Sequence, residues 1–269
     1  MKLVSLVPST TYTLASCPQL KSQLIACTKF CVEPPDLHCN VALVGGTKDP
    51  DLSKIRQLQP SHILVNREEN KPDDIEELRS IAAVHESLPK SPEDVLGMFA
   101  GMGDFLEEHS YFNGLIAKLQ SLLEQIARRG PWSHGHLTSG VKYLYLIWRE
   151  PYMLVGQDTY ISRLLELVGW KNAYHGQERY PSLSVTEMLS LDADLILLST
   201  EPFPFRERHW QKLQDEWRSY SHQVPNAYKI DGRLCSWHGL KTIEAVECML
   251  QLSNGSMPMN LIKPLSQNA

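Results

Sequence analysis

The sequence predicts an α/β protein of two Rossmann-like lobes joined by one long helix. Leu52 to Glu68 runs in step with Val185 to Glu201, at a constant offset of 133 residues. Each copy has the pattern of a short amphipathic helix, a turn and an apolar strand. Between the copies, the pattern from Pro92 to Arg129 is almost entirely helical. We therefore expect an N-terminal lobe over 1–90, a helical strut over 91–130, a C-terminal lobe over 131–253 and a mobile tail over 254–269.

The N-terminal lobe alternates strands with helices. Its strands are apolar runs, and that over His62–Asn66 is of the continuous kind typical of a parallel sheet. The expected strands are Leu3–Val7, Leu24–Thr28, His62–Asn66 and Val84–Leu88. Proline and capping residues mark the helices. The first expected helix begins with Thr10–Ser16, and two more cover Asp51–Leu58 and Asp73–Ala82.

The helical strut starts at a cap and the C-terminal lobe repeats the plan of the first. Ser91 precedes Pro92 at the first helical position, and Gly130-Pro131 ends the helical pattern. The expected strands of the second lobe are Lys142–Trp148, Leu195–Ser199 and Tyr228–Asp231. Its expected helices are Asp158–Val168, Val185–Leu191, Phe205–Trp217 and Leu240–Leu252.

Composition narrows the class of protein. The 269 residues are 42% hydrophobic, which is enough to bury the cores of two lobes. The formal net charge is −5 and the chain has no basic stripe, so we expect no nucleic-acid partner. No apolar run reaches the roughly 18–20 residues of a membrane helix, so we expect no membrane span.

The N-terminal segment bears on location. Leu14-Ala15-Ser16-Cys17 has the shape of a lipoprotein cleavage box, but Pro8 interrupts the apolar stretch before it. We therefore expect a cytoplasmic protein, with a periplasmic or lipid-anchored protein as the alternative. In a reducing compartment the six cysteines would be free thiols. Cys27, Cys31, Cys39 and His38 lie close enough in sequence to leave a zinc site as a second interpretation.

Ligands of open α/β sheets bind beyond the carboxyl ends of the strands, and this rule selects the candidate site residues. Aromatic side chains at these positions suit a flat or cationic ligand: Phe30, Trp148, Tyr152, Phe203 and Trp237. Arg149 suits a carboxylate or phosphate. Carboxylates and a histidine suit a cation or metal centre: Glu68, Glu150, Glu201 and His238. Glu69, next to Glu68, is a further candidate for ligand binding. Which metal, if any, they would bind is not specified by these residues.

Motifs of catalysis are missing from the sequence. It has no GxSxG elbow, no phosphate-binding GxxxxGK[ST] loop, no GxGxxG fingerprint and no HExxH pair. We therefore expect a protein that is not an enzyme and requires no cofactor. The alternative is an enzyme that uses Cys31 as nucleophile and His238 as base, brought together by closure of the lobes.

Several short segments together resemble a known family over nearly the whole chain. They are Leu3–Ser9, Thr28–Cys31 with Pro34-Pro35, Val44–Lys48, Asn66 with Glu68–Asn70, Tyr145–Arg149, Asp158–Ile161, Arg179–Pro181 and Ser236–Gly239. The chain resembles the helical-backbone metal receptors, the class III substrate-binding proteins that include cobalamin-binding proteins of importers. The resemblance implies a corrinoid, haem, siderophore or chelated metal as ligand, held in a cleft between the lobes. By position it implies ligand-wall residues Phe30, Thr47, Met153 and Tyr180, and pocket residues Trp148, Arg149, Trp237 and His238.

The sequence departs from the family pattern at two positions. Members that deliver to an ABC permease have a docking glutamate near the start of each repeated helix, and the matching positions are Ser53 and Thr186. Docking between charged patches needs complementary signs. Our first hypothesis is thus a non-catalytic binding protein that does not feed a permease. A conventional transport receptor for cobalamin or an iron chelate is the second, and the enzyme is the third.

Overall fold

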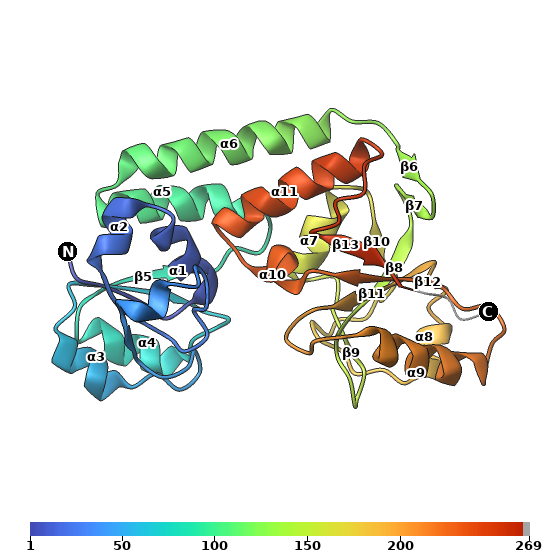
Figure 1. Cartoon of the computed structure of the whole chain (residues 1–269), viewed down its shortest axis with the longest axis horizontal. Helices are drawn as coiled ribbons and strands as arrows, with labels where there is room; N and C mark the ends of the chain where they lie inside the picture. Colours follow the sequence, from blue (N-terminus) through green and yellow to red (C-terminus); the bar gives the residue numbers. More distant parts are fainter. Residues whose placement is uncertain (266–269) are drawn as a thin grey trace. The chain divides into compact units, whose positions relative to one another are not determined.

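The computed structural model describes residues 1–265, which form two compact units (Figure 1). The first unit comprises Met1–Pro89, Asp94–Lys118 and Trp237–Lys241, and the second comprises the other described residues. No helix among residues 1–265 is both long and apolar enough to cross a membrane.

The first unit is built on a parallel five-stranded sheet of order β3-β2-β1-β4-β5. The strands are β1 (Leu3–Ser5), β2 (Leu24–Cys27), β3 (Ala42–Leu43), β4 (His62–Asn66) and β5 (Ala83–Ser87). The helices between them are α1 (Pro8–Ala15), α2 (Pro18–Gln23), α3 (Leu52–Leu58) and α4 (Pro72–Arg79), with a short 3-10 turn at Leu37–Cys39. Ile55 of α3 and Leu78 of α4 pack against Val4 and Ile63, so α3 and α4 cover one face of the sheet.

The second unit is built on a mixed sheet of order β10-β8-β11-β12-β13, in which β9 pairs with β8. Its strands are β8 (Lys142–Trp148), β9 (Met153–Leu154), β10 (Lys171–Asn172), β11 (Leu195–Ser199), β12 (Asn226–Ile230) and β13 (Ile262–Pro264). β9 and β13 are antiparallel to their neighbours. The helices are α7 (Tyr160–Glu166), α8 (Val185–Leu189), α9 (Glu207–Arg218), α10 (Gly232–Ser236) and α11 (Leu240–Ser253). A hairpin of β6 (Ser133–His134) and β7 (Leu137–Thr138) precedes β8.

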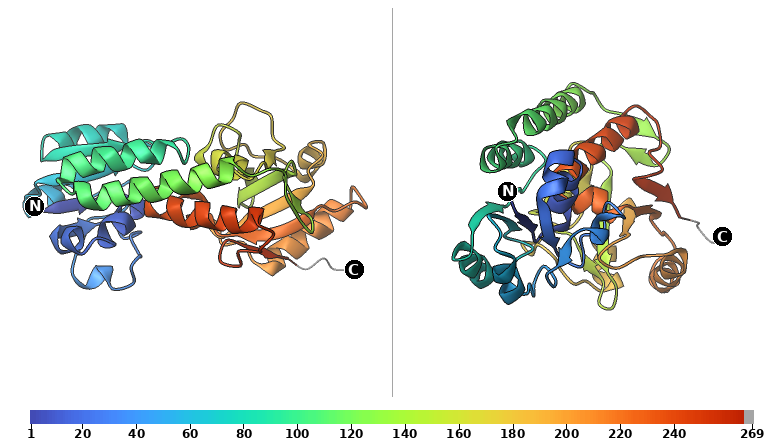
Figure 2. Two further views of the ribbon diagram at one scale, coloured as in Figure 1. Left: turned by 90° about the horizontal axis from the view of Figure 1, so that it is seen from above. Right: turned by 60° about the vertical axis from the view of Figure 1, so that its left-hand side comes forward.

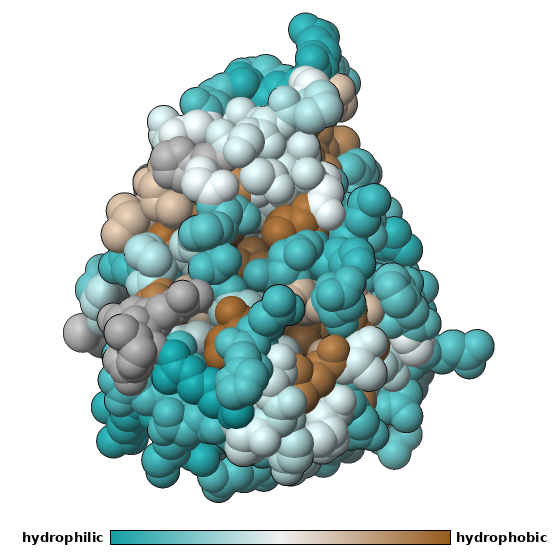
Figure 3. All heavy atoms as spheres, turned by 90° about the vertical axis from the view of Figure 1, so that its right-hand side faces the viewer, coloured by the Kyte–Doolittle hydropathy of each residue, from teal (hydrophilic) through white to brown (hydrophobic). Residues whose placement is uncertain are grey.

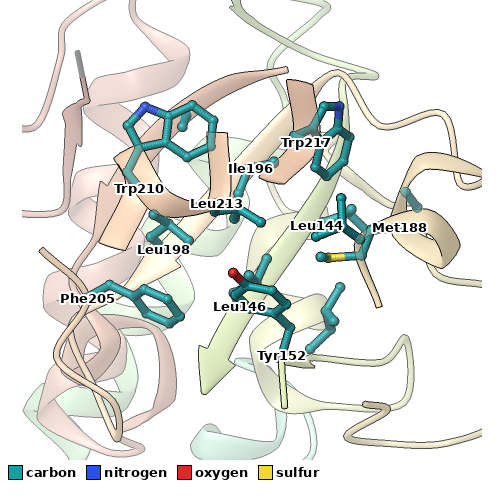
Figure 4. Close-up of a cluster of buried hydrophobic side chains, with 14 residues drawn as sticks. Leu144, Leu146, Tyr152, Met188, Ile196, Leu198, Phe205, Trp210, Leu213 and Trp217 are labelled. Carbon is teal, nitrogen blue, oxygen red and sulfur yellow. The ribbon is translucent and has the colours of Figure 1, made fainter. Parts of the chain in front are cut away.

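The core of the second unit is an aromatic layer between α9 and the sheet (Figure 4). Trp210, Leu213 and Trp217 repeat at helical spacing and are buried, as expected for the inner face of an amphipathic helix. They pack over Leu144 and Ile196 of the central strands. Aromatic side chains of this size supply a large apolar contact area, so α9 is firmly attached to the sheet.

The internal repeat is confirmed. α3 and α8 begin at residues 52 and 185, and β4 and β11 cover 62–66 and 195–199, which are the same positions at an offset of 133. Each helix begins with a side-chain N-cap at the equivalent position. Asp51 accepts from the Lys54 N–H, and Ser184 forms a capping box with Glu187. Equivalent core positions are also apolar in both units: Ile55 and Met188, Ile63 and Ile196, Val65 and Leu198.

The helical stretch over 91–130 contains two helices instead of one. α5 (Asp94–Leu106) ends where Glu107 adopts a left-handed conformation with φ of 55°, and α6 (His109–Ala127) is the longest helix within residues 1–265. The two helices lie side by side in both views of Figure 2. Gly103 permits this close approach, because a Cβ there would lie 3.3 Å from the Cβ of Phe112. The periodicity of the apolar residues continues through the break and so concealed it.

The expectation of a mobile tail from residue 254 needs correction. Ile262–Pro264 forms β13, which pairs with β12 through Ile230, and Leu261 and Ile262 are buried. The apolar run is too short to produce a periodic signal, and its order comes from pairing with the edge strand. Residues 266–269 lie outside the described residues.

Candidate functional site

In the first unit, a buried amide joins the loops at the carboxyl ends of three strands. Asn70 is 1% exposed, and its Nδ2 donates to the carbonyl of Thr47 at 2.9 Å and to that of Leu6 at 3.3 Å. Its Oδ1 accepts from the backbone N–H of Asn66 at 2.9 Å. Because these loops follow β1, β3 and β4, Asn70 fixes the edge of the sheet from which the predicted residues project.

The loop after β4 displays Glu68 and Glu69. The Asn66 side chain accepts from the backbone N–H groups of Glu68 at 2.8 Å and Glu69 at 3.3 Å, which is an Asx turn. Lys48 donates to the carbonyl of Glu68. Thr47, which precedes this lysine, is itself buried. The structure thus brings Thr47, Glu68 and Glu69 together at one edge of the sheet, and their contact with a ligand stays a prediction.

The turn after β2 exposes Phe30 and buries Cys31. Phe30 is 50% exposed and packs against Gly46, where a Cβ would lie 3.1 Å from the phenyl ring. The Cys31 thiol is 0% exposed and contacts the hydroxyls of Thr11 at 3.1 Å and Thr28 at 3.2 Å. Contacts with the Cys27 thiol and these hydroxyls lower the pKa of Cys31. The thiol lies inside the turn, so it is not presented to a ligand or substrate.

The segment Trp237–Lys241 belongs to the first unit, although the sequence placed Trp237 and His238 in the second lobe. Leu240 N–H donates to Thr13 Oγ1 at 3.0 Å, and Lys241 pairs with Glu33 at 3.2 Å. These long-range contacts have no local sequence signal. Burial lowers the pKa of His238 to about 4, so its imidazole is neutral near pH 7.

In the second unit, aromatic side chains gather at the carboxyl ends of β8 and β11. Trp148 is 42% exposed and lies edge-on to Phe203, with ring centroids 5.7 Å apart. The ring of Phe203 also packs edge-on to that of Phe205, with centroids 4.8 Å apart. Figure 3 shows that the small apolar areas on the face it presents are surrounded by polar side chains. An exposed tryptophan supported by other rings suits a flat ligand.

Met153 is the first residue of β9, and Tyr180 lies in a segment next to this strand. Tyr180 is exposed, and the guanidinium of Arg179 lies 6.0 Å from the centroid of its ring. The next residue, Pro181, accepts from the Leu154 N–H at 2.8 Å, so this segment is attached to β9. Met153 is half-buried on β9 and is paired with Trp148 of β8. The structure thus brings Trp148 and Met153 together, and the Tyr180 segment is bound to the same hairpin.

The turn between β8 and β9 lines a hollow of about 370 Å³ with Arg149, Glu150, Tyr152 and Glu216 among its residues. Arg149 pairs with Glu150 at 2.6 Å. Tyr152 OH donates to Glu216 at 3.1 Å, and burial together with this carboxylate raises the pKa of Tyr152. The hollow is small compared with pockets that enclose large cofactors.

Glu201 anchors the start of α10. Its carboxylate lies 3.5 Å from Arg233 Nε and 3.5 Å from Ser236 Oγ. Gly232 approaches it so closely that a Cβ would lie 2.6 Å from Glu201 Cγ. These contacts give Glu201 a structural role in addition to its predicted place at a strand end.

Metal ligands do not converge in the parts of the chain whose side chains are described. No three residues of the types His, Cys, Asp and Glu lie close enough there to hold an ion. The proposed zinc ligands include Cys39, whose side chain lies outside this description. Sequence reasoning placed Asn70 at a strand end without assigning it a role, and it missed His209, which has no recognisable motif around it.

A family model described as "Periplasmic binding protein" matches residues 3–221. The chain belongs to this family. No curated protein sequence is a significant match to it.

Solved structures of the periplasmic binding protein fold cover almost the whole chain. The periplasmic vitamin B12 binding protein BtuF of Vibrio cholerae is 18% identical, with a TM-score of 0.72 over 94% of this chain and 97% of that one. A periplasmic heme binding protein from Pseudomonas aeruginosa is 15% identical, with a TM-score of 0.77 over 100% and 99%. An ABC transporter substrate-binding protein from Listeria monocytogenes is 17% identical, with a TM-score of 0.66 over 94% and 98%. At these identities the likeness establishes the fold.

The expectation of a cytoplasmic protein is wrong. It is overturned by the match to a family of periplasmic binding proteins and by similar structures that are themselves described as periplasmic. The expectation relied on the weak signal-like character of the first residues, which form β1 and α1 in this fold. A short apolar strand followed by a proline resembles a poor leader segment as easily as it resembles the start of a sheet.

Proposed function

We propose that this member of the family is a non-catalytic receptor for a flat, metal-bearing ligand: a corrinoid, a haem or a comparable metal chelate. The proposal deepens the general ligand-binding role that the family and its structural relatives support. The location of the ligand between the lobes stays a prediction.

The exposed Trp148, supported by Phe203, is the observation that carries this proposal. It lies at the carboxyl end of β8, where ligands of α/β sheets bind. An indole that is 42% exposed offers a flat apolar face to a macrocycle, and stacking of aromatic surfaces adds about 0.5–1.5 kcal/mol beyond the area buried. Phe30, at the carboxyl end of β2 in the first unit, offers a second such face.

A catalytic role for Cys31 as nucleophile is disfavoured by its burial. A nucleophilic thiol must reach its substrate, whereas Cys31 is enclosed by Thr11, Thr28 and Cys27. A neutral imidazole at His238 would suit a ligand contact as well as a base.

The proposed receptor does not depend on a permease. Ser53 and Thr186 are both exposed near the starts of α3 and α8 and carry no charge. Glutamates there would give the charge complementarity that docking needs. The competing proposal is a transport receptor that docks through other residues. It is supported by the similarity to the ABC transporter substrate-binding protein from Listeria monocytogenes.

A thermal-shift screen tests the ligand class. The purified protein is heated with aquocobalamin, cobinamide, haemin, ferric siderophores or divalent metal salts. A ligand present at a hundred times its Kd stabilises the folded state by about 2.7 kcal/mol, which raises Tm by about 5–10 °C for a chain of this size. We expect such a shift with at least one macrocycle or chelate and none with the free metals. Shifts with free metals alone would overturn the proposal.

A further inference from the structure

The first turn of α9 contains a histidine whose two ring nitrogens both face N–H donors. His209 is 7% exposed. Its Nδ1 lies 3.0 Å from the backbone N–H of Arg206, and its Nε2 lies 3.1 Å from Nε of Arg208. A neutral imidazole carries one N–H and one acceptor nitrogen, so it can accept only one of these two hydrogen bonds.

The helix start decides which contact is a hydrogen bond. The Arg206 N–H is a fixed backbone donor at the N-cap, and His209 Nδ1 is its acceptor in a capping arrangement. The ring proton is therefore on Nε2. The N–H groups of His209 Nε2 and Arg208 Nε then meet without an acceptor between them.

Positive charge surrounds this pair of donors. Burial and the charges of Arg208, Arg149, Arg206 and Lys212 lower the pKa of His209. Arg206 is the N-cap of α9, and Arg208 and Lys212 lie in its first two turns. Within residues 1–265, Arg206, Arg208 and Lys212 have no carboxylate partner. The start of the helix adds a positive end of the macrodipole.

Two acids of the neighbouring hollow have partners outside this pair of donors. Glu150 pairs with Arg149, and Glu216 accepts from Tyr152 OH. The Nε of Arg149 is buried and has no acceptor among the described residues. Unsatisfied buried donors are uncommon in proteins, and a bound ion is one way to supply the acceptor.

We propose that Arg208 and His209 form an oxyanion subsite, which binds a carboxylate or phosphate group of the ligand. One oxygen accepts from Arg208 Nε and His209 Nε2, and Arg149 and Lys212 supply further positive charge. The centroid of the Phe203 ring lies 5.0 Å from that of His209 and 5.7 Å from that of Trp148. The subsite therefore adjoins the aromatic pair of Trp148 and Phe203. The inference rests on the proposed function and adds that the macrocycle is an acid.

The subsite is tested first with inorganic phosphate and with acetate, without any macrocycle. The imidazole nitrogen resonances of His209 are followed by NMR during each titration. We expect a saturable shift with millimolar affinity that weakens at least about tenfold in R208Q, because a charge-assisted hydrogen bond is lost. R218Q, at the last turn of α9, removes the same charge and is expected to keep the wild-type affinity. The titration stops at about 0.1 M anion, because screening weakens exposed ion pairs at that concentration. The subsite is overturned if neither anion gives a saturable shift by then. It is also overturned if R208Q and wild type have equal affinities.

A second titration separates this inference from the proposed function and distinguishes the two anion sources. Haemin carries carboxylates, its dimethyl ester carries none, and cobalamin carries a phosphodiester. We expect at least one acid to bind about tenfold more weakly to R208Q than to wild type, and the diester to be unaffected by the substitution. If R208Q binds haemin, its diester and cobalamin with the same affinities as wild type, the subsite is refuted and the receptor stands. If no macrocycle binds while phosphate still shifts His209, the subsite stands and the receptor is refuted.

Discussion

Asn70 is expected to be the polar side chain on which the carboxyl edge of the first sheet most depends. Replacement by alanine removes its three hydrogen bonds, which involve Leu6, Thr47 and Asn66. Each is worth about 0.5–1.5 kcal/mol, and the two carbonyls and one N–H left behind lose their partners in a buried place. We expect Asn70→Ala to lower the free energy of unfolding by about 2–4 kcal/mol, a large share of the roughly 5–15 kcal/mol of a typical domain.

Asn70→Asp sharpens the prediction, because it changes one amide NH₂ to oxygen at nearly constant volume. The new oxygen would face the carbonyls of Leu6 and Thr47, and a buried carboxylate carries a further desolvation cost. We therefore expect a loss at least as large as that of Asn70→Ala at pH 7, and a smaller loss near pH 4, where the carboxyl is protonated and can donate once.

Urea unfolding followed by circular dichroism measures these differences. Asn113→Ala is the control, since Asn113 is exposed on α6, and it is expected to change stability by less than about 0.5 kcal/mol. An Asn70→Ala variant within about 0.5 kcal/mol of wild type would refute the claim that this amide holds the edge together.

Three further predictions follow from single features. Because burial lowers the pKa of His238 to about 4, the unfolded chain takes up a proton before the native one as pH falls. We expect this to cost about 1–2 kcal/mol of stability between about pH 7 and pH 5, and H238Q to lose that part of the slope in urea titrations. Gly239→Ala should destabilise more than Gly255→Ala in thermal unfolding. Both glycines have positive φ, but only at Gly239 would a Cβ meet Thr13 Oγ1, at 2.4 Å. Finally, wild type should not bind a detergent-solubilised ABC permease that imports the identified ligand, whereas the S53E and T186E double variant should gain affinity in pull-down assays. Tight binding by wild type would support a transport receptor.

Periodicity predicts the repeated elements of this fold well. The bounds of β4, β8 and β11 agree with the sequence expectation because each strand is a continuous apolar run flanked by polar residues. The break at Glu107 was not predictable, because the apolar pattern continues through it. β13 was missed because its order depends on pairing with β12 and not on its own composition.

The candidate site was only partly predictable for a similar reason. Strand ends identify Phe30 and Trp148, and both are exposed. Strand ends do not reveal which side chains turn inward, as Cys31 does. Asn70 and His209 act through backbone groups and neighbours that folding brings to them, so their roles become visible only in three dimensions.

The central claim is that a macrocycle binds on Trp148, and a fluorescence titration tests it most directly. Haemin and aquocobalamin are titrated into wild type, Trp148→Ala and Tyr220→Ala, and quenching of the remaining tryptophans reports binding. Tyr220 follows the C-terminal end of α9, is 61% exposed and serves as the matched exposed aromatic. The account predicts saturable binding of at least one macrocycle to wild type, an affinity at least about tenfold weaker for Trp148→Ala, and no change for Tyr220→Ala. Binding of equal affinity by wild type and Trp148→Ala, or no binding of either macrocycle, would contradict it.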